Sequence, residues 1–226
     1  PRGRAPEAPV WLGALERRAV GTHDRPVRRT HMHDWHVDHG ADMLATGAWM
    51  RPRVYRRQGE SVTDAYIREA RTVRESVGIV DVSTLGKITV QGPDAADFLN
   101  RVYVNGFGTL GVGKARYGVM LREDGFVYDD GTTWRLGDDD FLMTTTTANA
   151  AGVLARLERH LAVDWPEMRV AVASATDQWA GLAIAGPEAR EVLECVVADV
   201  DLTDAGTPRS LYYIPETTRQ HKRPSA

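Results

Sequence analysis

Between residues 116 and 131 two short apolar runs, at residues 117–121 and 126–128, flank a polar turn, which is the pattern of two β-strands joined by a tight turn. The turn residues are Glu123-Asp124-Gly125, so the segment predicts an antiparallel hairpin. The first strand carries Tyr117, and the returning strand ends on two adjacent carboxylates, Asp129 and Asp130. A carboxylate that leaves water costs several kcal/mol unless it is paired or used. The hairpin is therefore a candidate floor for a polar, planar ligand.

Helical and strand periods mark the elements around this hairpin. Ser61–Val77 has a capping serine, an acid three residues later and Gly78 at its end, which together predict a helix. Asn149–Leu161 places its large apolar residues on one helical face and predicts a second helix. Apolar and β-branched runs predict strands at residues 79–82, 87–90 and 140–147.

One pattern occurs twice along the chain. Ile88–Leu99 and Leu182–Leu193 both run from an apolar strand through Gly-Pro into an apolar helix with an acid in its first turn. The repeat predicts an α+β fold built from two related strand–helix halves. The alternative is a good helix start that arose twice independently.

Composition narrows the class of protein. The chain has 226 residues, of which 42% are hydrophobic and 26% charged, as expected for an ordinary globular core. The formal net charge of −3 argues against a nucleic-acid partner, and there is no apolar run long enough to span a membrane. A single cysteine, Cys195, rules out a disulfide framework and favours a cytoplasmic location. Because Cys195 lies on an apolar helical face, we expect a buried, inert thiol.

The polar ends of the chain predict its domain organisation. Residues 1–30, rich in Pro, Arg and Gly, are expected to be a linker-like segment, and residues 31–203 a single domain. Residues 204–226 are polar, contain three prolines and have no sustained periodicity. We expect them to form a divergent, disordered tail.

Two polar motifs have more than one interpretation. His33, His36 and His39 are three residues apart and can share a helical face, so they can chelate a metal or belong to a polar segment docked on the protein; we favour no metal. The segment Asp81–Lys87 combines an acid, two hydroxyls and a cation. Turn chemistry and the rim of a ligand site explain it equally well.

Together these residues resemble the glycine-cleavage aminomethyltransferase (T-protein) family, and most closely the folate-binding region of the α subunit of heterotetrameric sarcosine oxidase. The resemblance runs from about residue 26 to about residue 202. The segments that carry it are His33–His36, Gly78–Ile88, Gly92–Tyr103, Arg116–Leu121, Asp124–Gly131, Phe141–Thr147 and Gln178–Ala180. Family members continue into a second half with further pterin-binding residues, so we expect an incomplete folate-binding domain whose C-terminal part is missing.

The resemblance also implies a site. Tyr117 and Asp130 take the positions that contact tetrahydrofolate, with Asp130 as the catalytic acid, and Asp129 is the second-ranked acid. The strand around Met143, Thr145 and Thr146 would line the pterin pocket. Because neighbours in a strand point to opposite faces, we expect Asp130 to face the ligand and Asp129 to face solvent or a basic group.

The implied reaction is capture of the iminium or formaldehyde unit from sarcosine oxidation, which gives 5,10-methylenetetrahydrofolate. Flavin and NAD would bind elsewhere in the complex, and the implied partners are the beta, gamma and delta subunits, the folate and a methylated amine. Three functions remain open: this one, a non-catalytic remnant or subunit-interaction module, and an aminomethyl- or demethyltransferase acting on another methylated amine.

Overall fold

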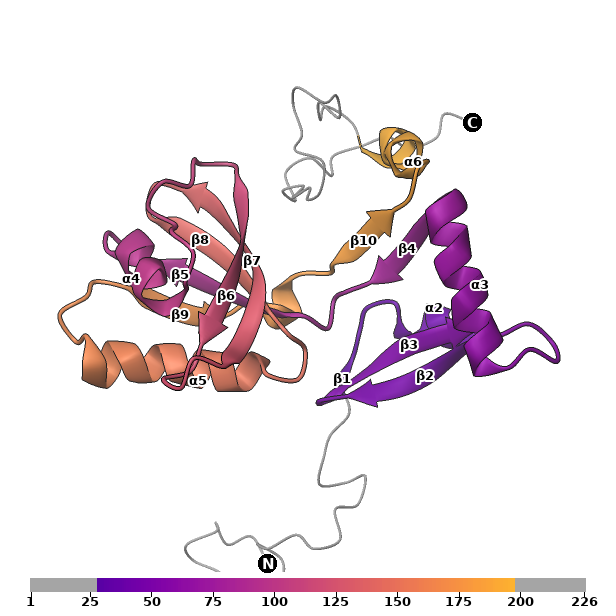
Figure 1. The fold of residues 1–226 in the computed structure, drawn as a ribbon, viewed down its shortest axis with the longest axis horizontal. Coiled ribbons are helices and arrows are strands. Elements are labelled where there is room, and N and C mark those ends of the chain that lie inside the picture. Colours follow the sequence, from indigo (N-terminus) through magenta and orange to yellow (C-terminus); the bar gives the residue numbers. More distant parts are fainter. Residues whose placement is uncertain (1–27, 198–226) are drawn as a thin grey trace, which may run out of the picture.

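The computed structural model describes residues 28–197, which form two lobes side by side (Figure 1). The first lobe contains β1 (Arg28–Arg29), α2 (His33–Asp38), β2 (Ala41–Thr46), β3 (Trp49–Tyr55), α3 (Val62–Glu75), β4 (Gly78–Asp81), β10 (Leu182–Ala185) and α6 (Ala189–Val196). The second contains β5 (Gly86–Gln91), α4 (Ala95–Val102), β6 (Ala115–Leu121), β7 (Val127–Gly137), β8 (Asp140–Thr145), α5 (Ala150–Arg159), a π-helical turn η1 (His160–Asp164) and β9 (Ala171–Ser174). A short 3-10 helix, η2 (Thr176–Gln178), precedes the crossing back to the first lobe.

The second lobe is built on a five-stranded antiparallel sheet with the order β6-β7-β8-β5-β9. One continuous core joins this sheet to α4 and α5. Its fully buried side chains include Phe98 and Leu99 from α4, Val153 and Leu157 from α5, and Ile88, Val90, Met120, Phe141 and Met143 from the strands. Each such side chain stabilises the fold by about 1.5–3 kcal/mol relative to exposure. The predicted hairpin, the second helix and the strands predicted at residues 87–90 and 140–147 are present here, whereas the strand predicted at residues 79–82 is β4 of the first lobe.

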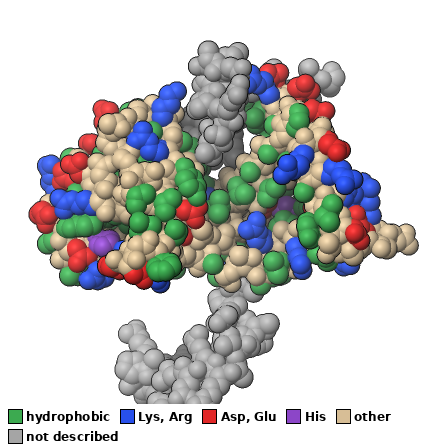
Figure 2. Space-filling view, viewed as in Figure 1, with side chains coloured by type: hydrophobic (Ala, Val, Ile, Leu, Met, Phe, Trp, Pro, Cys, Tyr) green, Lys and Arg blue, Asp and Glu red, His purple; other side chains and the backbone are tan. Residues whose placement is uncertain are grey.

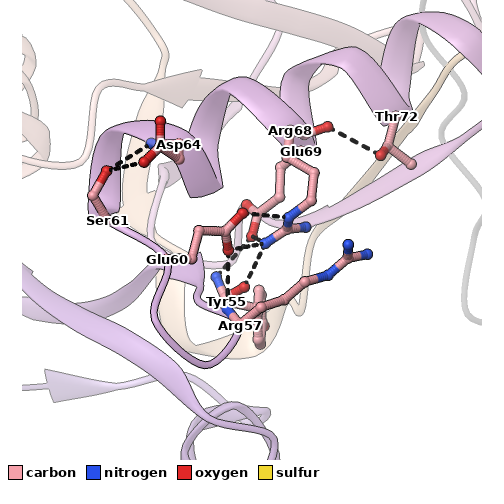
Figure 3. Close-up of polar contacts among 8 residues, drawn as sticks. All are labelled: Tyr55, Arg57, Glu60, Ser61, Asp64, Arg68, Glu69 and Thr72. Carbon is pink, nitrogen blue, oxygen red and sulfur yellow. Dashed lines mark hydrogen bonds and ion pairs between the residues drawn. The ribbon is translucent and has the colours of Figure 1, made fainter.

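In the first lobe, α3 begins where the sequence predicts. The Ser61 hydroxyl accepts a hydrogen bond from the Asp64 amide at 3.1 Å. Arg68 then holds the helix against β3: its guanidinium donates to both carboxylate oxygens of Glu60 at 2.8 Å and to the Tyr55 carbonyl at 2.8 Å (Figure 3). The hydrogen bonds from Arg68 lower the pKa of Glu60 to about 2.

The repeated strand–helix pattern has the same local structure at both sites. Gly92 and Gly186 both adopt positive φ, at 133° and 121°, and at both a Cβ would meet a backbone carbonyl oxygen within 2.3 Å. In each half, two strands lie before the glycine: β4 and β5 before Gly92, and β9 and β10 before Gly186. Each of these strands pairs with a strand of the other half, β5 with β9 and β4 with β10. The two related halves predicted from the sequence therefore interlock at the junction of the lobes.

The helices of the two strand–helix copies, α4 and α6, differ in burial, and this corrects the expectation that Cys195 is buried. Whereas α4 packs into the core, no residue of α6 is buried within residues 28–197, and Cys195 is exposed. The strands beside it are also uncovered: Ile79, Val80 and Leu182 are 46–60% exposed. Figure 2 shows charged side chains of both signs over the lobes and apolar side chains gathered in the middle, where the lobes meet. The apolar periodicity of α6 was correctly recognised, but it does not say what the helix packs against.

Residues 1–27 and 198–226 lie outside the described part of the chain, and with them lie the predicted tail and nearly all of the predicted linker segment. Across the described residues, each helix is too short or too polar to span a bilayer.

Candidate functional site

The hairpin of β6 and β7 sets the geometry of the candidate site. Tyr117 pairs with Thr132 and Val119 pairs with Asp130, which makes Tyr117 and Asp130 diagonal neighbours across the two strands. The turn closes with a hydrogen bond from the Gly125 amide to the Arg122 carbonyl at 3.0 Å. Near the turn, Met120 opposes Asp129 and Leu121 opposes Val127, so Tyr128 is the extra residue of a β-bulge.

Tyr117 and Asp130 meet on the exposed face of the hairpin. The Tyr117 hydroxyl donates a hydrogen bond to Asp130 Oδ2, and the tyrosine side chain remains 54% exposed. The hydrogen bond to the carboxylate raises the pKa of Tyr117, because the carboxylate stabilises the protonated phenol. The structure thus brings together the two residues that the sequence placed at the centre of the site.

Asp129 lies on the opposite, buried face of β7 and is 4% exposed. Its carboxylate accepts hydrogen bonds from the Thr146 hydroxyl at 2.6 Å, from the Thr146 amide at 3.2 Å and from the Asn149 side chain at 3.4 Å. Burial raises its pKa, and these hydrogen bonds offset part of that shift. The expected alternation of the two acids is confirmed, but the expectation that Asp129 faces solvent or a basic group is wrong. Neutral donors from a later turn bind it instead.

The threonine-rich strand β8 and the residue after it place the three predicted pocket residues in different surroundings. Met143 is fully buried in the core and Thr145 is 1% exposed, so neither lines a surface shared with Tyr117. Thr146 binds Asp129 instead. A residue that the sequence analysis missed, Thr144, contacts the partner of Tyr117: its hydroxyl accepts from the Thr132 amide at 2.9 Å and donates to the Thr132 carbonyl at 3.1 Å. The period-2 pattern of β8, with Met143 facing the core, is the signal that identifies Thr144.

The segment Asp81–Lys87 forms a buried polar junction between the lobes. Asp81 accepts from the Ser83 amide at 2.9 Å and pairs with His36 Nε2 at 3.0 Å. Ser83 also accepts from the Gly181 amide at 3.0 Å, and the Lys87 ammonium donates to the Ser83 carbonyl at 2.7 Å. Of the two interpretations of this segment, turn chemistry describes its contacts.

The histidine-rich segment docks onto the protein through His36. His36 is 3% exposed, and its Nδ1 lies 2.6 Å from the Tyr55 hydroxyl. His39 points elsewhere and stacks on Trp35 with ring centroids 4.0 Å apart. Residues 28–197 contain no cluster of three or more His, Cys, Asp or Glu side chains arranged to hold a metal ion. The contacts are those of a docked polar segment.

The burial of Lys87 should make the free energy of unfolding depend on pH. Burial lowers its pKa from 10.5 to about 8 in the folded protein. Between these pH values the unfolded chain binds more protons than the folded chain, so this lysine's contribution to stability rises with pH. We expect the melting temperature of the unaltered chain to gain a few degrees on that of Lys87→Met between pH 7.5 and pH 10.

Thermal unfolding at the two pH values measures this difference, and the titration of other groups cancels between the two proteins. Lys114 is exposed, so Lys114→Met is the matched control and should show no such pH-dependent difference. Parallel behaviour of Lys87→Met and the unaltered chain would contradict the prediction.

The chain is similar to several known proteins. The profile of the GCVT N-terminal domain family matches residues 32–213. Sarcosine oxidase subunit alpha of Rhizobium meliloti (strain 1021) is 54% identical over 201 residues, which cover 88% of this chain and 20% of that protein. An aminomethyltransferase of Thermotoga neapolitana is 32% identical over 180 residues, which cover 80% of this chain and 46% of that protein.

A solved structure supports the same relationship. The glycine cleavage system aminomethyltransferase T from Bartonella henselae matches with a TM-score of 0.64 and 26% identity, over 74% of this chain and 43% of that chain. The chain spans about a fifth of the length of the sarcosine oxidase α relatives it matches.

Proposed function

Because the chain belongs to the GCVT N-terminal domain family, we propose that it forms the tetrahydrofolate-binding face of a sarcosine oxidase α subunit. The observation that carries the proposal is the Tyr117–Asp130 pair, an exposed aromatic ring hydrogen-bonded to a carboxylate. In the full-length protein, this face would take up the one-carbon unit from sarcosine oxidation, and 5,10-methylenetetrahydrofolate would be the product.

The residues present fit such a ligand. An aromatic ring that is half exposed offers a flat surface on which a planar heterocycle can stack. The hydrogen bond from Tyr117 occupies one oxygen of Asp130 and fixes the carboxylate beside that surface. The Thr144 hydroxyl accepts from the backbone amide of Thr132 and donates to its carbonyl, which leaves a neutral strip next to the acid.

The chemistry assigned to the chain is electrostatic. A bound tetrahydrofolate would supply the nucleophilic amine. Asp130 would hold its negative charge beside the cationic one-carbon donor and accept the proton released at nitrogen. The antiparallel sheet would keep the carboxylate at a fixed distance from the stacked ring, which lowers the entropic cost of bringing the reactants together.

The rest of the reaction is assigned to other parts of the complex. Oxidation of the methylated amine, the flavins and NAD would belong to regions outside this chain, including the beta, gamma and delta subunits. The proposal for this chain is therefore a ligand-binding and one-carbon-capture function, and sarcosine is its proposed amine.

Binding of a reduced folate tests the proposal. We expect calorimetric titration with 5-formyltetrahydrofolate, a stable reduced folate, to give a dissociation constant between micromolar and millimolar. Tyr117→Ala should weaken binding by about tenfold, because an aromatic stacking contact contributes roughly 1 kcal/mol beyond the area it buries.

The chain offers a matched control for this substitution. Tyr66 on α3 is exposed to the same extent, 51% against 54%, and lies in the other lobe. Tyr66→Ala should leave the dissociation constant unchanged. If millimolar folate produced no heat with the unaltered chain, or if the two tyrosine substitutions weakened binding equally, the proposed binding face would be wrong.

A further inference from the structure

Asp129 is a buried carboxylate whose partners all lie in one later segment of the chain. Thr146 supplies its amide and hydroxyl, and Asn149 supplies its side-chain amide. Both residues belong to the turn between β8 and α5, and Asn149 is the residue at the start of α5. No ion pair with Asp129 is formed among the described residues, so the carboxylate is held by neutral donors alone.

The same turn also holds the β-bulge next to Asp129. The Asn149 side chain donates to the Tyr128 carbonyl at 3.0 Å. On the other side of Asp130, Gly131 lies so close to β8 that a Cβ would fall 2.0 Å from the Thr144 carbonyl oxygen. The backbone on either side of Asp130 is thus held close to neighbouring elements, at Tyr128 by Asn149 and at Gly131 by its close approach to Thr144 of β8.

Among the described residues, Asp130 has fewer side-chain hydrogen bonds than its neighbour Asp129. Asp130 lies on the exposed face, where its side chain has one hydrogen bond, from Tyr117. A strand that twists at a bulge can change the direction of the next side chain, unless the bulge is held. We propose that Asp129 is a positioning residue that fixes the Asp130 carboxylate toward the ligand by anchoring the bulge of β7 to the β8–α5 turn. This inference rests on the proposed function of the Tyr117–Asp130 face.

A double-mutant cycle on folate binding tests this dependence. The proteins are the unaltered chain, Asp129→Asn, Asp130→Asn and the double variant, each titrated with 5-formyltetrahydrofolate. We expect Asp129→Asn to weaken binding by about five- to tenfold, because its amide group presents donors to donors and releases the turn. In the Asp130→Asn background the same change should weaken binding by less than about twofold, since its effect acts through Asp130.

Further variants separate positioning from general stability. Thr146→Val removes the hydroxyl and should reproduce part of the Asp129→Asn effect, whereas Thr146→Ser keeps the hydroxyl and should bind as the unaltered chain does. Glu60→Gln weakens an ion pair in the other lobe and controls for a lower melting temperature. If Asp129→Asn does not fold, the Thr146 pair alone decides the outcome.

The outcomes distinguish the inference from the function on which it rests. If Asp130→Asn weakens binding but the Asp129 and Asp130 effects are additive, or if Thr146→Ser and Thr146→Val behave alike, Asp129 has a structural role only and the inference is overturned. If the unaltered chain does not bind folate, both the proposed function and the inference fail.

Discussion

Under the proposed function, Asp130→Asn in the assembled complex should reduce formation of 5,10-methylenetetrahydrofolate by about two orders of magnitude or more. The substitution keeps the volume of the side chain but removes the negative charge that stabilises the cationic one-carbon donor and the group that accepts the proton. Under the proposed function, sarcosine oxidation takes place elsewhere in the complex. Its rate should therefore stay nearly unchanged, with free formaldehyde released in place of the folate product.

Parallel assays of amine oxidation, free formaldehyde and methylenetetrahydrofolate measure this effect. Asp97→Asn is the control, because Asp97 is an exposed acid on α4, which packs on the covered side of the same sheet. It should leave all three rates unchanged. Asp129→Asn should fall between these two variants, since it alters the position of Asp130 and not its charge. An Asp129→Asn defect as large as that of Asp130→Asn would mean that the reactive acid has been misassigned.

The parts of this fold that the sequence predicted are those determined by neighbouring residues. The turn at Gly125, the serine cap of α3 and the two Gly-Pro helix starts depend on a few adjacent positions, and all are present. The side-chain contact between Tyr117 and Asp130 was also predictable, because one short hairpin joins their strands and brings the two residues close together.

The environment of the second acid was not predictable in the same way. Asp129 was expected to face solvent or a basic group, because the alternation of the strand places it on the face opposite to Asp130. Its actual partners, Thr146 and Asn149, are 17 and 20 residues later and become neighbours only when α5 packs on the sheet. His36 of α2 and Asp81 of β4, which are 45 residues apart, likewise form a buried pair only in the folded first lobe.

Strand β8 shows a different limit of the prediction. A family resemblance assigned its residues to the ligand pocket as a group, although consecutive residues of a strand cannot face one side. The buried neighbours of Met143 place it in the core, and the alternation then places Thr144 on the face of Tyr117. Consistent use of the period of two would have separated these residues from the sequence alone.

The strand register also makes Gly131 the position at which a methyl group should be most damaging. Gly131 pairs with Gly118, and a Cβ on Gly131 would lie 2.0 Å from the carbonyl oxygen and 2.7 Å from the carbonyl carbon of Thr144. These are backbone atoms of the neighbouring strand, so no side chain can rotate away and the two strands must separate. We expect Gly131→Ala to destabilise the domain by about 3 kcal/mol or more, which lowers the melting temperature by roughly 6–12 °C.

Gly137, at the end of the same strand, separates this clash from the general effect of replacing a strand glycine. A Cβ there meets the Asp140 Cβ at 3.6 Å, an ordinary contact. Gly137→Ala should therefore leave the stability unchanged or raise it by up to about 1 kcal/mol, because alanine restricts the unfolded chain. Thermal unfolding followed by circular dichroism compares the two variants directly.

Because Gly131 follows Asp130 and holds β7 against β8, its substitution should also abolish folate binding below the melting transition, whereas Gly137→Ala should bind normally. Equal melting temperatures for the two variants would show that β7 and β8 have more room at Gly131 than the structure gives them.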